Sequence, residues 1–144
     1  MVKIQVVSLK VKKEKVITLK ERISFPQDAM DVLIKYIGDS DRENFIVIAL
    51  DTNLHINCIH TVSIGTLNMT QVHPREVFKI AILANANSII VGHNHPSGNL
   101  TPSNQDIEVT NKLKEAGNML GIQVIDHIIV SSTEAISLKE KGLI

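Results

Sequence analysis

The order of hydrophobic and polar residues along the chain predicts strands interleaved with helices. β-Branched residues alternate with polar ones near the N-terminus, on both sides of a lysine-rich turn, so residues 1–22 are expected to form a β-hairpin. Longer apolar runs further along are typical of buried strands. The predicted strands are 2–9, 16–19, 45–50, 54–64, 88–91 and 122–130.

Apolar residues at helical spacing predict three helices between these strands. The first begins at Pro26 and ends at Gly38, the second begins at Pro74, and the third covers Ser103–Met119. The last residues are expected to add a short edge strand or a turn. The fold class is therefore α/β of the α+β type: a mixed, curved sheet flanked by helices.

Composition fits one domain with a substantial core. The chain has 144 residues, of which 44% are hydrophobic, so residues 24–144 are predicted to form the core that follows the hairpin. A single cysteine cannot form an internal disulfide, which favours a cytoplasmic location. No signal peptide is evident, and no apolar run approaches the roughly 20 residues that a membrane helix needs.

Charge argues against nucleic acid and membrane as partners. The 15 basic and 15 acidic residues cancel, and the one basic cluster, between Lys10 and Lys15, is expected at the tip of the hairpin. A nucleic-acid-binding surface normally shows a basic patch or stripe. We therefore expect no strong binding to nucleic acid and none to a membrane.

Two histidines at the exit of a predicted strand are the strongest chemical signal. His93 and His95 stand two residues apart, so an extended backbone points both rings to one face. Ser103 and Asp106 follow at the start of the next predicted helix. Helix capping explains Ser103 and Asp106 but leaves the two histidines unexplained. Two histidines and a carboxylate, with room for a water, are the ligands of a catalytic zinc.

Other candidate sites are weaker. Cys58 with a nearby histidine could form a thiol nucleophile, but no third group is present to orient it. Asp126 and His127 could support the metal site from behind, form a surface dyad, or be a satisfied structural pair. Two familiar zinc signatures, His-Glu-x-x-His and Pro-Cys-x-x-Cys, do not occur in the chain.

The spacing His-x-His, seven residues, Ser, two residues, Asp resembles the motif of the JAB/MPN metallopeptidase-like domains known as JAMM. Three stretches resemble its RadC-like branch: Val72–Phe78, His93–Gly98 and Leu120–Val130. The resemblance covers essentially the whole chain and implies a JAB/MPN sandwich related in architecture to cytidine deaminases. Full-length RadC proteins carry an N-terminal helix-hairpin-helix segment, so this chain is more similar to the short stand-alone form.

The resemblance implies a zinc-dependent hydrolase that cuts a peptide, isopeptide or related amide bond. His93, His95 and Asp106 would bind Zn²⁺, whose bound water has a pKa lowered to about 7. Ser103 would donate a hydrogen bond to the oxyanion or to the attacking water. The family's general base precedes a strand, a place that Glu43 matches, while Glu76 in an Arg-Glu-Val sequence is the rival.

A second function class stays open. The label "DNA repair protein" attached to RadC-like chains suggests an accessory associated with nucleic acid or a non-catalytic interaction module. The neutral charge and the 3% content of aromatic residues argue against direct DNA binding. The complete set of ligands and base argues for chemistry.

Overall fold

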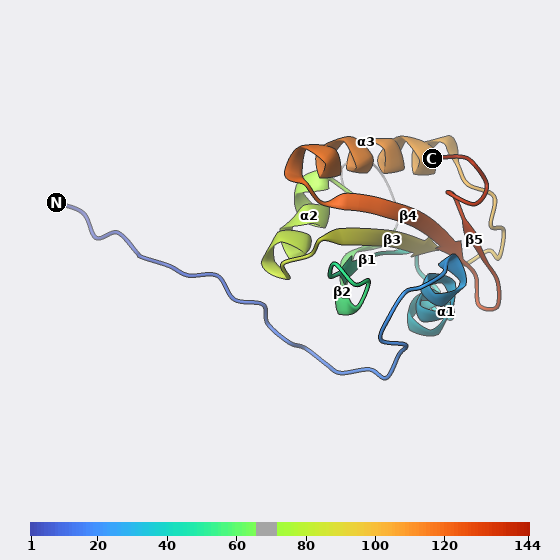
Figure 1. Ribbon diagram of the computed structural model, residues 1–144, viewed down its shortest axis with the longest axis horizontal. Helices are drawn as coiled ribbons and strands as arrows, with labels where there is room; N and C mark the ends of the chain where they lie inside the picture. The colour runs from blue at the N-terminus through green and yellow to red at the C-terminus, as the bar shows by residue number, and fades with distance from the viewer. Residues whose placement is uncertain (66–71) are drawn as a thin grey trace.

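The computed structural model describes residues 1–65 and 72–144 and contains a five-stranded mixed sheet between helices (Figure 1). The strands are β1 (Asn44–Leu50), β2 (Ile56–Ile64), β3 (Ser88–Asn94), β4 (Gln123–Val130) and β5 (Ala135–Ser137). The helices are α1 (Pro26–Ile37), α2 (Pro74–Leu83) and α3 (Asn104–Leu120). The predicted fold class is confirmed.

The sheet has the strand order β2-β1-β3-β4-β5, which puts β3 at its centre. β1 pairs antiparallel with β2 and with β3, whereas β3 and β4 are parallel and are joined through α3. β5 closes the other edge by antiparallel pairing with β4. All seven residues of β3 are buried, as expected for a strand paired on both sides and covered on both faces.

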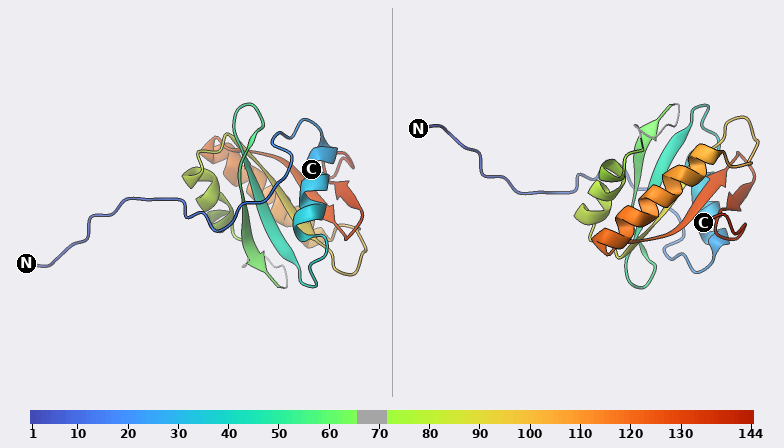
Figure 2. Two further views of the ribbon diagram at one scale, coloured as in Figure 1. Left: turned by 90° about the horizontal axis from the view of Figure 1, so that it is seen from below. Right: turned by 90° about the horizontal axis from the view of Figure 1, so that it is seen from above.

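Helices cover both faces of the sheet. α1 packs on one face, where Leu33 lies directly over Gly92: an added Cβ at Gly92 would come within 2.4 Å of Leu33 Cδ1. α2 and α3 lie on the opposite face, over a second core cluster that includes Phe45, Phe78 and Leu113 (Figure 2). The missing side chain at Gly92 thus lets α1 approach the end of β3 closely.

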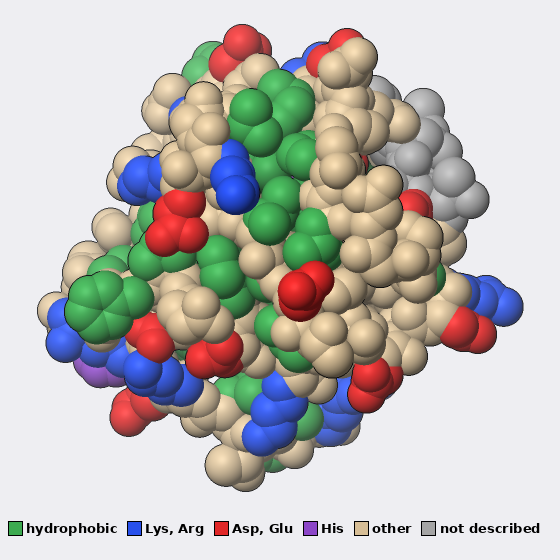
Figure 3. Space-filling model, turned by 90° about the vertical axis from the view of Figure 1, so that its right-hand side faces the viewer, with side chains coloured by type: hydrophobic (Ala, Val, Ile, Leu, Met, Phe, Trp, Pro, Cys, Tyr) green, Lys and Arg blue, Asp and Glu red, His purple; other side chains and the backbone are tan. Residues whose placement is uncertain are grey.

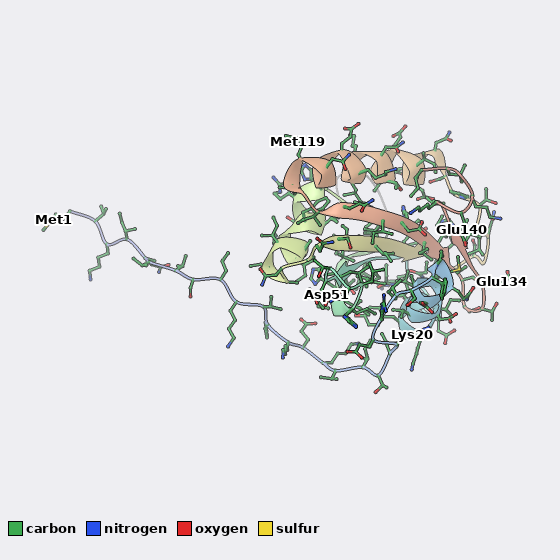
Figure 4. All side chains as sticks on the ribbon, viewed as in Figure 1. Met1, Lys20, Asp51, Met119, Glu134 and Glu140 are labelled. Atoms are coloured by element: carbon green, nitrogen blue, oxygen red, sulfur yellow. The ribbon has the colours of Figure 1, made fainter. Side chains whose placement is uncertain are left out.

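The predicted N-terminal hairpin is wrong. Residues 1–20 contain no strand, and the segment extends away from the folded body, with Met1 at its far end and Lys20 beside α1 (Figures 1 and 4). Pairing begins only at Arg22, which forms an antiparallel bridge with His55. A two-stranded hairpin is marginal by itself, and apolar side chains such as Val6, which is fully exposed here, have no layer to pack against.

β3 is longer than the sequence indicated. The apolar run suggested that the strand ends before Gly92, but pairing with β1 and β4 continues it to Asn94. His93 therefore sits inside the sheet. Residues 66–71, between β2 and α2, lie outside the described residues. Of the described helices, none combines the length and the apolar character needed to cross a membrane.

Candidate metal centre

The end of β3 brings the two histidines together. His93 is fully buried and its ring is nearly parallel to that of Phe45, at an interplanar angle of 13°. The Nε2 atoms of His93 and His95 lie 2.9 Å apart, so both rings face one point, as the two-residue spacing predicted. The Nδ1–H of His95 donates to the carbonyl oxygen of Asn99 over 2.5 Å, which leaves Nε2 of His95 free to act as a ligand.

The first turn of α3 supplies the third group. Ser103 is the N-cap residue: its Oγ accepts a hydrogen bond from the backbone N–H of Asp106, and its own N–H donates to Asp106 Oδ2 over 2.8 Å. This capping box turns the carboxylate of Asp106 toward the histidines. Its two oxygens lie 3.4 Å from His93 Nε2 and 3.6 Å from His95 Nε2.

These three side chains fit a zinc ion. Their ligand atoms all lie within 4.8 Å of one another. Ligands at 2.0–2.2 Å from a tetrahedral zinc stand roughly 3.3–3.6 Å apart, close to the two distances between histidine and carboxylate. Only the two histidine nitrogens would have to separate slightly. Three protein ligands leave a fourth position open, which is typical of a catalytic rather than a structural site.

Electrostatics favour a cation at this point. Burial alone would raise the pKa of the Asp106 carboxyl, but the adjacent rings of His93 and His95 hold it well below its usual range. The nearby Asp106 carboxylate raises the pKa of His95, partly opposed by burial. The carboxylate is therefore ionised at neutral pH, and its negative charge faces ring nitrogens rather than solvent.

Two further residues stand behind His93. His127 on β4 places Nε2 at 2.7 Å from Nδ1 of His93, and its own Nδ1 lies 2.6 Å from Oγ1 of Thr110 on α3. Burial lowers the pKa of His127 well below the ordinary histidine value, so the ring is neutral. The sequence suggested a supporting role for His127 as one of three readings but gave no signal for Thr110, whose contact depends on how α3 packs on the sheet.

Asp126 accepts a hydrogen bond from the backbone N–H of His127, but no bond joins the two side chains. Both are buried, which excludes the surface dyad. The Asp126 carboxylate accepts hydrogen bonds from Ser137 Oγ and from the backbone N–H of Lys139, and so attaches β5 and the following turn to β4. Neighbouring strand residues point to opposite faces, and only His127 reaches the metal centre.

The two candidate bases have different surroundings. Glu43 immediately precedes β1, whose Phe45 pairs with His93 on β3. Its charge adds to the upward shift of the His95 pKa, after the larger effect of Asp106. Glu76 lies in the first turn of α2, where Lys79 Nζ donates to its Oε2 over 2.8 Å. The proximity of Glu43 to His95, and the pairing of Glu76 with Lys79, favour Glu43 as the base. This role stays a prediction.

The thiol-nucleophile reading finds no support. Cys58 is half-buried on β2, and burial raises the pKa of its thiol, which lowers the fraction of reactive thiolate at neutral pH. His73 serves as the N-cap of α2, with its Nδ1 accepting from the backbone N–H of Arg75 over 3.0 Å.

Comparison with known families agrees with this geometry. Residues 23–143 match the family model described as RadC-like JAB domain. The chain belongs to this family. Its predicted membership is thereby confirmed, and the match takes in β1, β3 with His93, the following His95, and all of α3.

Relatives of this RadC-like JAB domain are named UPF0758 proteins. The chain is similar to a UPF0758 protein of Caldanaerobacter subterraneus, with 51% identity over 83% of this chain and 52% of the relative. It is also similar to a UPF0758 protein of Methanosarcina mazei, with 45% identity over 87% of this chain and 55% of the relative. The chain thus spans about half the length of the curated relatives it matches.

Proposed function

We propose that this RadC-like JAB domain is a zinc-dependent hydrolase of amide bonds, with a peptide or isopeptide as substrate. The observation that carries the proposal is the convergence of His93, His95 and Asp106, whose ligand atoms lie within 4.8 Å of one another around a partly enclosed point. Zinc bound there would supply a Lewis acid that lowers the pKa of water toward 7 and polarises a carbonyl group.

The chain's own residues supply the proton transfers. Glu43, which immediately precedes β1 and whose charge acts on His95, would take a proton from the attacking water and give it to the leaving amine. The Ser103 hydroxyl already accepts a bond from the N–H of Asp106, so its own hydrogen can be donated to the carbonyl oxygen of the substrate as charge develops there. Ser103 is exposed, which leaves room for a substrate.

An activity profile tests the proposal. The zinc-loaded chain is incubated with a library of peptides and isopeptides, and released amine is measured before and after removal of zinc with a chelator. We expect cleavage that disappears with the chelator and returns when zinc is added back. Cleavage that persists in Asp106→Asn after zinc removal would show that the site does not perform it.

A further inference from the structure

A chain of three buried hydrogen bonds joins one candidate ligand to another. It runs from His93 Nδ1 to His127 Nε2 over 2.7 Å and from His127 Nδ1 to Thr110 Oγ1 over 2.6 Å. The Thr110 hydroxyl then donates to the backbone carbonyl of Asp106 over 2.6 Å. The side chains of His93, His127 and Thr110 are at most 1% exposed, so water does not compete for these bonds.

The Thr110 hydroxyl, at the end of this series of hydrogen bonds, determines which atom is the donor in each bond. Thr110 has one hydroxyl hydrogen, and it is donated to the Asp106 carbonyl, which can only accept. The oxygen of Thr110 must therefore accept from His127 Nδ1–H. A neutral His127 protonated at Nδ1 has a bare Nε2, which accepts a hydrogen bond from Nδ1–H of His93.

We propose that Thr110 and His127 are positioning residues that hold His93 in the tautomer with a bare Nε2. That nitrogen is the one that faces His95 and Asp106. If these hydrogen bonds ran in the opposite direction, Nε2 of His93 would carry a hydrogen and could not bind a cation. The inference rests on the proposed zinc site and adds the residues that set its affinity.

The three hydrogen-bonded side chains come from three different elements, which supports the positioning role. His93 comes from β3, His127 from the neighbouring β4, and Thr110 from α3, one turn after Asp106. The Phe45 ring also packs here: its centroid lies 5.6 Å from that of the His127 ring, and the two ring planes are nearly perpendicular. The ring of His93 is thus fixed in both orientation and tautomer before a metal arrives, and partners of this kind commonly affect metal affinity 10–100-fold.

Substitution at Thr110 separates the hydrogen bond from the packing. Thr110→Val keeps the shape of the side chain but removes the acceptor for His127, whereas Thr110→Ser keeps the hydroxyl. Zinc affinity is measured by competition with a chromophoric chelator. We expect Thr110→Val to weaken zinc binding about 10–100-fold and Thr110→Ser to bind within about threefold of the unmutated chain. Equal affinity of Thr110→Val and the unmutated chain overturns the inference.

A spectroscopic readout tests the tautomer directly. Long-range ¹H–¹⁵N spectra of the zinc-loaded, unmutated chain should show His93 and His127 both protonated at Nδ1. Protonation of His127 at Nε2 overturns the inference, and this result does not depend on whether a variant folds. His127→Leu, which removes the acceptor for His93 without a substitution in α3, should weaken zinc binding at least as much as Thr110→Val.

The two proposals fail in different ways. If the unmutated chain binds no zinc, the zinc site itself is wrong and the positioning role falls with it. If the unmutated chain binds zinc but Thr110→Val and His127→Leu bind it equally well, only the positioning role is overturned.

Discussion

The side-chain oxygen of Asn94 accepts a hydrogen bond from the backbone N–H of Asn44 over 2.7 Å. The amide nitrogen of the same side chain donates to the carbonyl oxygen of Arg42 over 2.8 Å. Asn94, which lies between the two histidines and is fully buried, therefore binds the backbone on both sides of Glu43. The strand that carries His93 therefore also holds the backbone around the candidate base in place.

This relationship predicts the effect of Asn94→Ala. The variant should keep zinc but lose most hydrolysis, because a displacement of about 1 Å in a catalytic group can cost 10²-fold in rate. The buried backbone N–H of Asn44 would also lose its partner, which should lower the free energy of unfolding by roughly 1–3 kcal/mol. The control is Asn57→Ala, which removes an exposed amide that donates to Ala84. Unchanged turnover in Asn94→Ala would show that it does not position the base.

The two glutamates can be told apart by the same substitution. Glu43→Gln should retain zinc and fold but lose about 10²–10⁴-fold in hydrolysis, because glutamine cannot accept the proton. Glu76→Gln, which removes the partner of Lys79 on the surface of α2, should leave turnover within a few-fold. Turnover and zinc content are measured on both variants. The reverse pattern would move the base to Glu76.

Much of the fold could be predicted because periodicity and turn residues agree along most of the chain. Pro26, Pro74 and Ser103 mark helix starts within one residue of where they occur. The hairpin prediction for residues 1–22 failed because alternating apolar residues alone do not make a strand. A strand also needs a partner strand and a layer to cover it. The predicted length of β3 was too short because the glycine at position 92 suggests a strand end. In the structure, Gly92 is the place where Leu33 packs against the strand.

The grouping of the three candidate metal ligands could be predicted because they lie close together in sequence. His93 and His95 stand two residues apart at the end of β3, and Asp106 lies in the first turn of the next helix. Thr110 and Asn94 could not be recognised because their roles depend on tertiary contacts, with α3 lying against β4 and β1 beside β3. A threonine inside a helix and an asparagine in a strand are ordinary until the packing is known.

Low pH should remove the stabilisation that the Asp28 carboxylate gives to the start of α1. A hydrogen bond from Lys20 and the backbone N–H groups of Phe25 and Ser24 lower the pKa of Asp28 below 3.8, against the effect of burial. The unfolded chain then binds the proton more tightly, so the stabilisation is complete above about pH 5 and is lost as the pH falls through the folded-state value.

Urea unfolding of metal-free protein at several pH values checks this. The difference in unfolding free energy between the unmutated chain and Asp28→Asn should shrink between about pH 5 and pH 2. Asp31→Asn, at an exposed position of the same helix, corrects for the loss of one negative charge. A difference that stays constant with pH would contradict the assigned role of Asp28.

Duplex or single-stranded DNA should bind weakly. The formal net charge is zero, and acidic and basic side chains are intermixed around hydrophobic ones on the face in Figure 3. At physiological salt, fluorescence anisotropy should therefore show no binding tighter than about 1 μM. Sub-micromolar binding that weakens steeply with added salt would show a basic surface and favour the nucleic-acid-associated alternative.

Metal analysis of the purified chain tests the central claim most directly. After reconstitution with zinc and removal of excess metal, the unmutated chain should contain close to one zinc per molecule. His93→Ala, which removes the buried ligand, should contain almost none, while Glu76→Gln should match the unmutated chain. An unmutated chain that retains no zinc, although it is folded by circular dichroism, would contradict the account.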